Sequence, residues 1–232
     1  MPPFRLPGRC HRSPLYGSAP YRLNQLLEAV GLECLRGDRR LFKDIGFGLE
    51  PGDLLHVTGR NGSGKTTLLR MLCGLVRPAA GNVNWAGRPI THLGDEYLRH
   101  LTYVGHQNAI KDDLSARENL SISCSLSGQK VTGEQVAASL SRMGLKGHEH
   151  LPVRVLSQGQ RRRVALSRLL LAGTALWVLD EPFSALDVQA VETLQNAIRG
   201  HLSGGGMLVL TTHQEVPLEG GRVLTLEMGA RR

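Results

Sequence analysis

The stretch LLHVTGRNGSGKT, residues 54–66, decides the fold of this chain. Its first part, Leu54 to Thr58, predicts a buried strand, and the glycine-rich loop that follows fits the pattern G-x-x-x-x-G-K-[ST]. Residues Thr66 to Leu75 then predict a helix that ends before Pro78. A strand before this loop and a helix after it are the context in which the pattern binds nucleotide phosphates. The sequence therefore predicts an α/β fold of the P-loop NTPase class.

The loop offers three kinds of contact to a nucleotide. Its glycines let backbone N–H groups wrap around the phosphates, Lys65 reaches the β- and γ-phosphate oxygens, and the Thr66 hydroxyl is offered to Mg²⁺. The alternative is a glycine-rich turn that fits the pattern by chance. We expect ATP to be held by the following residues: Gly59, Arg60, Asn61, Gly62, Ser63, Gly64, Lys65, Thr66 and Thr67.

An apolar run, Leu176 to Leu179, ends in two acidic residues. A carboxylate at the end of a buried strand is costly unless it meets a metal or its water shell, so Asp180 is a candidate Mg²⁺ ligand. Glu181 is placed to act as a general base, or to orient the attacking water, beside the γ-phosphate. The alternative is a pair of solvated acids before Pro182.

A third element, LSQGQ at residues 156–160, begins another predicted helix. Ser157 and Gln160 fit a capping box, in which the serine hydroxyl accepts one backbone N–H and the glutamine side chain accepts another. The amide of Gly159 and the positive end of the helix dipole would then face an anion. The alternative is an ordinary helix start.

Further polar residues stand next to predicted elements. Gln107 comes just after a strand at residues 101–104, and His213 follows a strand at 207–212 and should reach the same sheet edge as Asp180. Taken alone, such a glutamine carries no meaning, and a lone histidine is an ordinary surface or core residue. The segment Ser184-Ala185-Leu186-Asp187 precedes a predicted helix that its aspartate is placed to cap.

In this order along the chain, the elements resemble those of the ATP-binding cassette (ABC) ATPases. The resemblance implies a mostly parallel core sheet, an antiparallel β subdomain and a helical insert. It identifies Asp180 as the Walker B aspartate, Gln107 as the Q-loop glutamine that senses Mg²⁺ and the attacking water, and His213 as the switch histidine that contacts the γ-phosphate. It also implies a D-loop, ending at Asp187, that crosses to a partner domain.

The resemblance extends to residue roles and assembly. It implies that the LSQGQ element is the signature motif, which meets the γ-phosphate of a second copy through Ser157, Gly159 and Gln160. It further implies a homodimer that binds two MgATP between antiparallel copies. The catalytic set is then Lys65, Gln107, Glu181 and His213, and the Mg²⁺ site is Thr66, Gln107 and Asp180.

Two positions depart from the family pattern. Gln158 stands where the commonest form of the signature has glycine. The aromatic residue expected to stack on adenine is absent, and counting back from Asp44-Ile45 lands near Arg36. Either the Arg36 guanidinium stacks on the adenine, or the affinity for the base is weak.

Three longer strings narrow the resemblance. They are GHQxxIKxxLxxxENL at residues 105–120, LWVLDEPF at 176–183 and TTHQ at 211–214. They are similar to the ATPase subunit of the cytochrome c maturation system, the haem exporter of the CcmA type. That resemblance implies integral membrane subunits as partners and a peripheral location on the cytoplasmic face of the inner membrane. It leaves open whether hydrolysis moves haem, reductant or a haem-loaded chaperone.

Three other functions are compatible with parts of the sequence. One is the ATPase subunit of another ABC transporter. A soluble ABC ATPase that acts on nucleic acid or ribosomes usually has two cassettes or long coiled coils, which this chain lacks. A small-molecule kinase or GTPase built on the phosphate loop would leave the signature and His213 unexplained.

Composition limits the number of domains and the classes of partner. The 232 residues suit one domain with a small insert, and the longest apolar run, Leu169 to Leu179, is too short for a bilayer. Four cysteines show no C-x-x-C spacing, which indicates reduced thiols in a cytoplasmic protein. The net charge of +8 raises nucleic acid as a partner. We predict none, because aromatics for base stacking are lacking and the excess charge gathers in the N-terminal tail, residues 161–163 and residues 231–232, as a solvated surface.

The chain divides into a tail and one ABC ATPase domain, residues 25–232. Residues 1–24 contain no acid and are rich in proline, arginine, glycine and serine, so they predict a disordered tail, a transit peptide or a start codon assigned too early. A helical subdomain is expected at about residues 112–172, where the pairs Ser115/Glu118 and Thr132/Gln135 fit capping boxes.

Overall fold

The computed structural model describes residues 27–37, 39–214 and 221–229. The predicted disordered tail, residues 1–24, and the arginines at 231–232 lie outside the described residues.

The first sheet is antiparallel and has the strand order β2-β1-β4-β5. It consists of β1 (Leu27–Arg36), β2 (Arg39–Leu49), β4 (Ala80–Trp85) and β5 (Arg88–Pro89). Alternation along β2 buries Leu49 fully and Ile45 and Phe47 partly, as the sequence predicts. This sheet is the predicted antiparallel β subdomain, and the alternation turns one face of it toward the core.

The second sheet is parallel and has the strand order β6-β7-β8-β3-β9. Its strands are β6 (Leu101–Val104), β7 (Leu176–Asp180), β8 (Met207–Thr211), β3 (Leu54–Gly59) and β9 (Val223–Met228). Every residue of β7 and β8 is buried, which explains their continuous apolar sequences, because helices cover both faces of the sheet.

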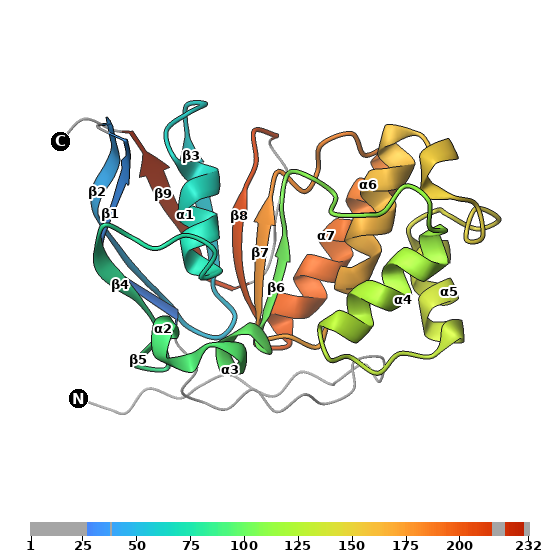
Figure 1. Cartoon of the computed structure of the whole chain (residues 1–232), viewed down its shortest axis with the longest axis horizontal. Coiled ribbons are helices and arrows are strands. Elements are labelled where there is room, and N and C mark those ends of the chain that lie inside the picture. Colours follow the sequence, from blue (N-terminus) through green and yellow to red (C-terminus); the bar gives the residue numbers. More distant parts are fainter. Residues whose placement is uncertain (1–26, 38, 215–220, 230–232) are drawn as a thin grey trace, which may run out of the picture.

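Helix α1 (Lys65–Leu72) lies between the two sheets, and α7 (Val188–Ser203) covers the opposite face of the parallel sheet (Figure 1). The helix after the phosphate loop ends earlier than the predicted Leu75. The helix stops because Gly74 adopts a left-handed conformation, with φ of 72°. Glycine adopts this conformation without strain. Two short helices, α2 (Ile90–Leu93) and α3 (Asp95–Leu98), precede β6.

The helical elements gather at one end of the molecule, within the range of the predicted insert (Figure 1). They are α4 (Ala116–Leu126), α5 (Gly133–Arg142) and α6 (Gln158–Ser167), with 3-10 turns η1 (Val153–Val155) and η2 (Arg168–Leu170). Capping boxes begin α4, α5 and α6, which confirms all three predicted ones. The insert has a core of its own, built around Leu120, Leu140 and Val164.

Within the described ranges, no helix is both long and apolar enough to cross a bilayer. The described cysteines, Cys34, Cys73 and Cys124, are free and buried, as the lack of a C-x-x-C spacing predicts. Burial raises the pKa of the Cys73 thiol, so this side chain packs as a neutral group.

One buried histidine supports the parallel sheet from the α7 side. The His201 ring stacks on Trp177 with centroids 4.0 Å apart and planes 6° apart, and its Nε2 lies 3.0 Å from the Met207 carbonyl oxygen. Burial lowers the pKa of His201 from 6.5 to about 4. The ring is therefore neutral at pH 7 and donates Nε2–H to Met207.

We expect this histidine to make stability pH-dependent. Above pH 6.5 neither state binds a proton at His201; as the pH falls toward 4, the unfolded chain binds one and the folded chain does not, so stability falls. Between pH 7 and 5 the loss should be about 2 kcal/mol from this group. His201→Phe keeps the stacking and should remove that part of the slope in urea unfolding. The exposed control His92→Phe should retain it, and equal slopes in all three proteins would contradict the assignment.

Candidate active site

The carboxyl ends of three neighbouring strands meet at one edge of the parallel sheet. Asp180 at the end of β7 pairs in register with Thr211 at the end of β8, and β8 pairs with β3, which ends at Gly59. This is the edge at which open α/β sheets bind ligands. The phosphate loop and the two acidic residues are therefore side by side, as the sequence predicts.

The phosphate loop needs glycine at positions where nothing larger fits. Gly59 has φ of 134°, and a Cβ there would lie 2.4 Å from the Met228 carbonyl oxygen. Gly64 has φ of 100°, and a Cβ there would lie 2.9 Å from the Phe42 ring. The Ser63 hydroxyl is buried without a hydrogen-bond partner among the described residues, so the loop keeps one polar group for a ligand.

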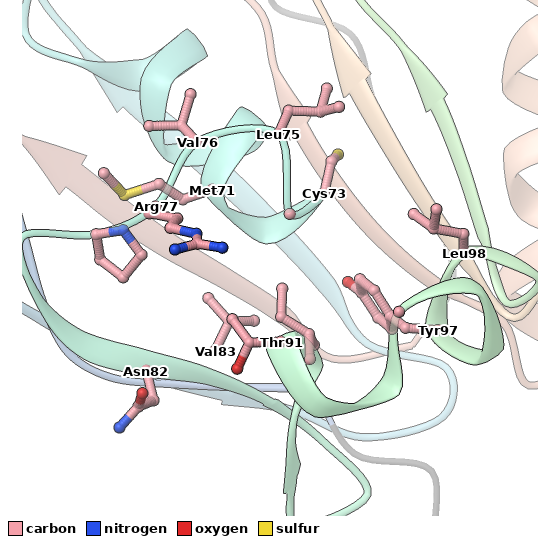
Figure 2. Close-up of a pocket in the computed structure, with 14 residues that line it drawn as sticks. Met71, Cys73, Leu75, Val76, Arg77, Asn82, Val83, Thr91, Tyr97 and Leu98 are labelled. Atoms are coloured by element: carbon pink, nitrogen blue, oxygen red, sulfur yellow. The ribbon is translucent and has the colours of Figure 1, made fainter.

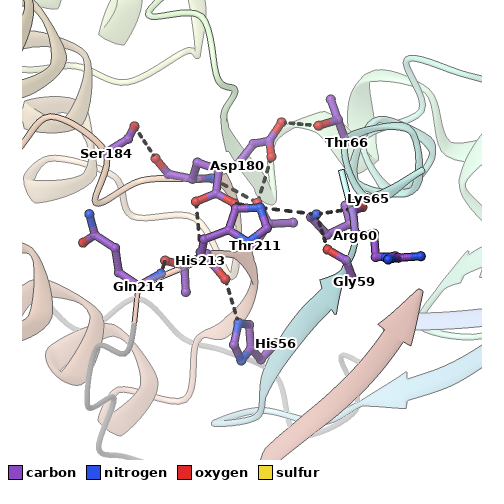
Figure 3. A network of polar contacts seen from close by, with 12 residues as sticks. His56, Gly59, Arg60, Lys65, Thr66, Asp180, Ser184, Thr211, His213 and Gln214 are labelled. Atoms are coloured by element: carbon purple, nitrogen blue, oxygen red, sulfur yellow. Dashed lines mark hydrogen bonds and ion pairs between the residues drawn. The ribbon is translucent and has the colours of Figure 1, made fainter. Parts of the chain in front are cut away.

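Lys65 lies across the loop and faces the end of β8 (Figure 3). Its Nζ donates to the Gly59 carbonyl oxygen at 2.6 Å and to the Arg60 carbonyl oxygen at 3.3 Å. The same nitrogen is 3.5 Å from Nε2 of His213. Two residues more than 100 positions apart in the sequence thus share one end of the site.

Hydroxyl groups satisfy both oxygens of the buried Asp180 carboxylate. Thr66 Oγ1 donates to Oδ2 at 2.8 Å, and Thr211 Oγ1 donates to Oδ1 at 2.8 Å (Figure 3). Since a buried carboxylate without partners is costly, these two threonines explain how Asp180 is tolerated at 2% exposure. Thr211 was not among the predicted residues, although its place at the end of β8 is a signal that points to it.

The Glu181 backbone is held in an unusual conformation. Its φ is 50°, in the left-handed region, which costs a non-glycine residue about 1–3 kcal/mol. Its N–H lies 3.1 Å from the Thr211 carbonyl oxygen and 3.0 Å from Thr211 Oγ1. Its carbonyl oxygen accepts from Ser184 Oγ at 2.9 Å and from Arg162 Nη2 at 2.9 Å. Such strain is typical of functional sites, where surrounding bonds fix one residue.

The Glu181 carboxylate points toward His213. Its Oε2 accepts the His213 backbone N–H at 3.2 Å, and its Oε1 is 3.5 Å from His213 Nε2 without a hydrogen bond among the described residues. The His213 loop is in turn contacted by His56, whose Nε2 is 3.4 Å from the Thr212 carbonyl oxygen. One carboxylate oxygen thus stays available to accept a proton or orient a water molecule.

These groups open onto one hollow of about 500 Å³, a size typical of ligand sites. Arg36 is part of the lining of this hollow. Three residues at its wall were not predicted, and Leu41 on β2 is one of them. Arg70 lies one helical turn after Thr66 on α1, a spacing that could have revealed it, and His106 adjoins Gln107. The lining includes Arg36, Asn61, Gly62, Gly64, Lys65, Thr66, Thr67, Arg70, His106, Asp180, Glu181 and His213.

Gln107 stands apart from this group. It is exposed and lines a neighbouring hollow of about 400 Å³, whereas His106 lines both this hollow and the one at the phosphate loop. In this conformation the structure does not bring Gln107 to the Asp180 carboxylate.

The signature residues lie on α6. Ser157 caps this helix, because its Oγ accepts the Gln160 N–H at 3.2 Å and Gln160 Oε1 accepts the Ser157 N–H at 2.9 Å. A Cβ on Gly159 would lie 2.8 Å from the Ala185 carbonyl oxygen, so α6 packs tightly on the segment before α7. None of these three residues is among the described lining of the 500 Å³ hollow.

Asp187 caps α7, with Oδ1 accepting the Ala190 N–H at 2.9 Å. Its Oδ2 is 3.4 Å from Nη1 of Arg163, which ties the cap to α6. The helix-cap interpretation of Asp187 is therefore confirmed as geometry.

Comparison with known proteins settles the family. The model of the ABC transporter family matches residues 42–184. The chain belongs to this family. It is an ABC-type ATPase, and the two sheets with their helical insert confirm the predicted fold class.

Two relatives with long matches carry the same description. A cytochrome c biogenesis ATP-binding export protein, CcmA, of Nitrosospira multiformis is 52% identical over 202 residues, covering 87% of this chain and 98% of that protein. The protein of this name from Pseudomonas aeruginosa is 49% identical over 205 residues, covering 88% and 100%.

Two solved structures share the fold. An ABC transporter ATP-binding protein from Pyrococcus furiosus has a TM-score of 0.75 at 25% identity, covering 88% of this chain and 97% of that one. The ATP-binding subunit of another ABC transporter has a TM-score of 0.74 at 24% identity, covering 81% and 79%.

The arginine triplet at residues 161–163 is not the solvated run that the sequence predicted. Arg162 is 3% exposed, and burial lowers the pKa of its guanidinium. Arg161 donates to the carbonyl oxygens of Leu156 and Arg154. On a helix, consecutive residues point about 100° apart, so one of three adjacent arginines turns into the core.

A second, apolar hollow of about 270 Å³ lies beside the carboxyl end of α1 (Figure 2). Met71, Val83 and Leu98 contribute to its wall, with Arg77 at the same hollow. Its buried hydroxyl, on Tyr97, donates to the Leu72 carbonyl oxygen at 2.6 Å, and burial raises the pKa of this phenol. Its described lining has no acidic residue, so this hollow offers no carboxylate that could act as a base or hold a metal ion.

Proposed function

We propose that this chain is the ATP-hydrolysing subunit of a membrane transporter that serves cytochrome c biogenesis. The observation that carries the hydrolytic part is the meeting of Lys65, Thr66, Asp180, Glu181 and His213 at one sheet edge. The pathway is supported by two relatives named as cytochrome c biogenesis ATP-binding export proteins, at about half identity over nearly their whole length.

The phosphate loop binds the triphosphate in this proposal. Gly64 provides no side-chain cap to α1, so the first N–H groups of the helix are available to phosphate oxygens. The buried Ser63 hydroxyl supplies a further donor, and Lys65 exchanges its contacts with loop carbonyl oxygens for the β- and γ-phosphates. Arg36, at the same hollow, is the group closest in character to an adenine-stacking residue.

The donor set near Thr66 fits Mg²⁺. Thr66 Oγ1 and Asp180 Oδ2 are hard oxygen ligands that lie 2.8 Å apart. Mg²⁺ takes few protein ligands and completes its shell with water and phosphate, so one hydroxyl and one carboxylate suffice. When bound, the ion neutralises charge on the phosphates. Gln107 would join this site only after a movement of the segment that follows β6.

Glu181 serves as the general base in this proposal. Its free Oε1 accepts a proton from water or orients it, while the left-handed backbone holds the carboxylate beside His213. His213 and Lys65 stand together where negative charge builds up on the γ-phosphate, so both stabilise the transition state.

A second copy completes each site. Ser157, Gly159 and Gln160 form a capped, positively polarised helix start that is remote from the chain's own phosphate loop lining, with Ser157 exposed. In a twofold dimer each copy presents this helix start to the nucleotide of the other. The D-loop segment up to Asp187 would then lie at the contact between copies.

The complex is peripheral to the membrane in this proposal, on the cytoplasmic face of the inner membrane, and integral subunits form the pathway. The chain's part is energetic: ATP closes the dimer and pushes the membrane subunits, and hydrolysis resets them. Haem, or a haem-loaded chaperone that must be released, is the proposed cargo.

We expect Glu181→Gln to retain ATP binding and to lower turnover by about 10²–10⁴-fold, because an amide cannot accept the proton. Phosphate release and ATP affinity measure the two effects. The exposed acid Glu192 on α7 provides the control Glu192→Gln, which should hydrolyse at the wild-type rate. A Glu181→Gln protein with wild-type turnover would sink the assignment of the base.

Mixing two inactive variants tests the dimer. Lys65→Ala disables the phosphate loop and Ser157→Arg disables the signature, but a mixed dimer has one site in which both elements are intact. Random mixing makes half of the dimers mixed, so about a quarter of wild-type activity should return. Turnover by a chain that stays monomeric with ATP bound, or no recovery from a verified mixed dimer, would count against shared sites.

The pathway is tested in a bacterium that lacks its own version of this ATPase. Cells that carry Lys65→Ala should lose covalent c-type cytochromes, accumulate a haem-loaded intermediate and keep b-type haemoproteins, which acquire haem without covalent attachment. Haem staining of denaturing gels measures the c-type proteins, and the exposed Lys146→Ala serves as control. Normal c-type cytochromes in the Lys65→Ala strain would refute the pathway and leave a general transporter function.

A further inference from the structure

Arg162 joins three parts of the site that are distant in sequence. It is carried by α6, the helix that begins with the signature residues, and its side chain is buried. Nη1 donates to the Gly105 carbonyl oxygen at 2.9 Å and to Asn108 Oδ1 at 3.1 Å, on the segment that contains Gln107. Nη2 donates to the carbonyl oxygens of Asp180 at 3.1 Å and Glu181 at 2.9 Å.

These contacts do not form an ordinary buried ion pair. All four acceptors are neutral oxygens, three of them on the backbone, and burial lowers the pKa of the guanidinium despite the nearby Asp180 and Glu181 charges. Taking a cation out of water is costly, so the contacts must serve the arrangement of the segments they join. The planar fork of arginine reaches two pairs of acceptors at once, which a lysine cannot do.

The contact with Glu181 falls on a strained residue. Glu181 has a left-handed backbone, and its carbonyl oxygen accepts only from Arg162 and Ser184 among the described contacts. Arg162 Nη2 donates to the carbonyl oxygens of both peptides that flank the Glu181 Cα, those of Asp180 and Glu181. Holding both peptides fixes φ and ψ of Glu181, and with them the direction in which its side chain leaves the backbone.

We propose that Arg162 is a positioning residue that sets the orientation of the Glu181 carboxylate and links it to the signature helix and to the segment after β6. The inference rests on the proposed role of Glu181 as base. When α6 moves relative to the parallel sheet, the Arg162 guanidinium transmits the movement to the Glu181 backbone. The helix that contacts the nucleotide of the partner copy therefore also repositions the base of its own chain.

The chain offers a matched control in Arg168. This partly buried arginine follows α6 in η2, burial also lowers its pKa, and its Nη2 donates to the Tyr103 carbonyl oxygen on β6. No described contact joins it to Asp180 or Glu181. Arg162→Met and Arg168→Met thus remove the same group from similar surroundings, and only the first loosens the base.

The experiment measures kcat, KM, the affinity for MgADP by calorimetry and the melting temperature for Arg162→Met, Arg162→Lys and Arg168→Met. We expect both methionine variants to lose melting temperature. Arg162→Met should lower kcat by about 10–100-fold with MgADP affinity within about twofold of wild type, because a small displacement of a base is costly. Arg162→Lys should fold and recover part of kcat, while Arg168→Met retains kcat below its melting temperature.

A double-mutant cycle separates positioning from general damage. If Arg162 acts through Glu181, adding Arg162→Met to Glu181→Gln should change the single-turnover rate with radiolabelled ATP by less than about twofold. A further loss of 10-fold or more would overturn the inference, as would equal kcat losses in Arg162→Met and Arg168→Met. If Arg162→Met does not fold, wild-type kcat in Arg162→Lys overturns it.

The Glu181 and Arg162 variants separate the role of the base from the role of the residue that positions it. Wild-type turnover in Glu181→Gln would remove the base itself, whatever Arg162 does. Loss of turnover in Glu181→Gln with normal kcat in Arg162→Met would leave the base in place and remove only its link to α6.

Discussion

The hydroxyl of Thr211 is the contact on which the site depends. It donates to the Asp180 carboxylate and accepts the N–H of Glu181, so one side chain orients both acids. The contact exists because β7 and β8 are parallel neighbours whose register sets Asp180 beside Thr211. Without such hydrogen bonds, the loss of solvation of a carboxylate at 2% exposure would destabilise the fold. The other oxygen of Asp180 then meets Thr66, and this joins the strand ends to the phosphate loop.

Local patterns predicted much of the fold, and long-range pairings did not. The strand β6 has the predicted bounds, β8 ends one residue before the predicted end, and the three capping boxes are present, because all of these depend on neighbouring residues. The strand β9, Val223–Met228, was not predicted. It is a partly exposed edge strand in which Leu224, Leu226 and Met228 alternate with more exposed residues, a signal that could have revealed it. Its pairing with β3, across more than 160 residues, is the part that local sequence does not show.

The site was predictable where chemistry follows strand ends, and less so where side-chain direction decides. Lys65, Thr66, Asp180, Glu181 and His213 meet as expected, because parallel strands share an edge. The direction of the Gln107 side chain and the burial of Arg162 are decided residue by residue, because neighbouring side chains leave the backbone in different directions. A run of charged letters does not reveal which member turns inward, and packing against β6 and β7 determines it.

The helical insert satisfies backbone N–H groups at the starts of its helices with side chains of its own. At the start of each of α4, α5 and α6 the side-chain oxygen of an N-cap serine or threonine accepts a backbone N–H of the first turn, and the three helices share a core separate from the sheets. Such a body can turn as a unit without stranding backbone amides in apolar surroundings. The hydrogen bonds that oppose such a turn are those that cross from the insert to the sheet, among them the bonds that the Arg162 and Arg168 guanidiniums donate to backbone carbonyl oxygens.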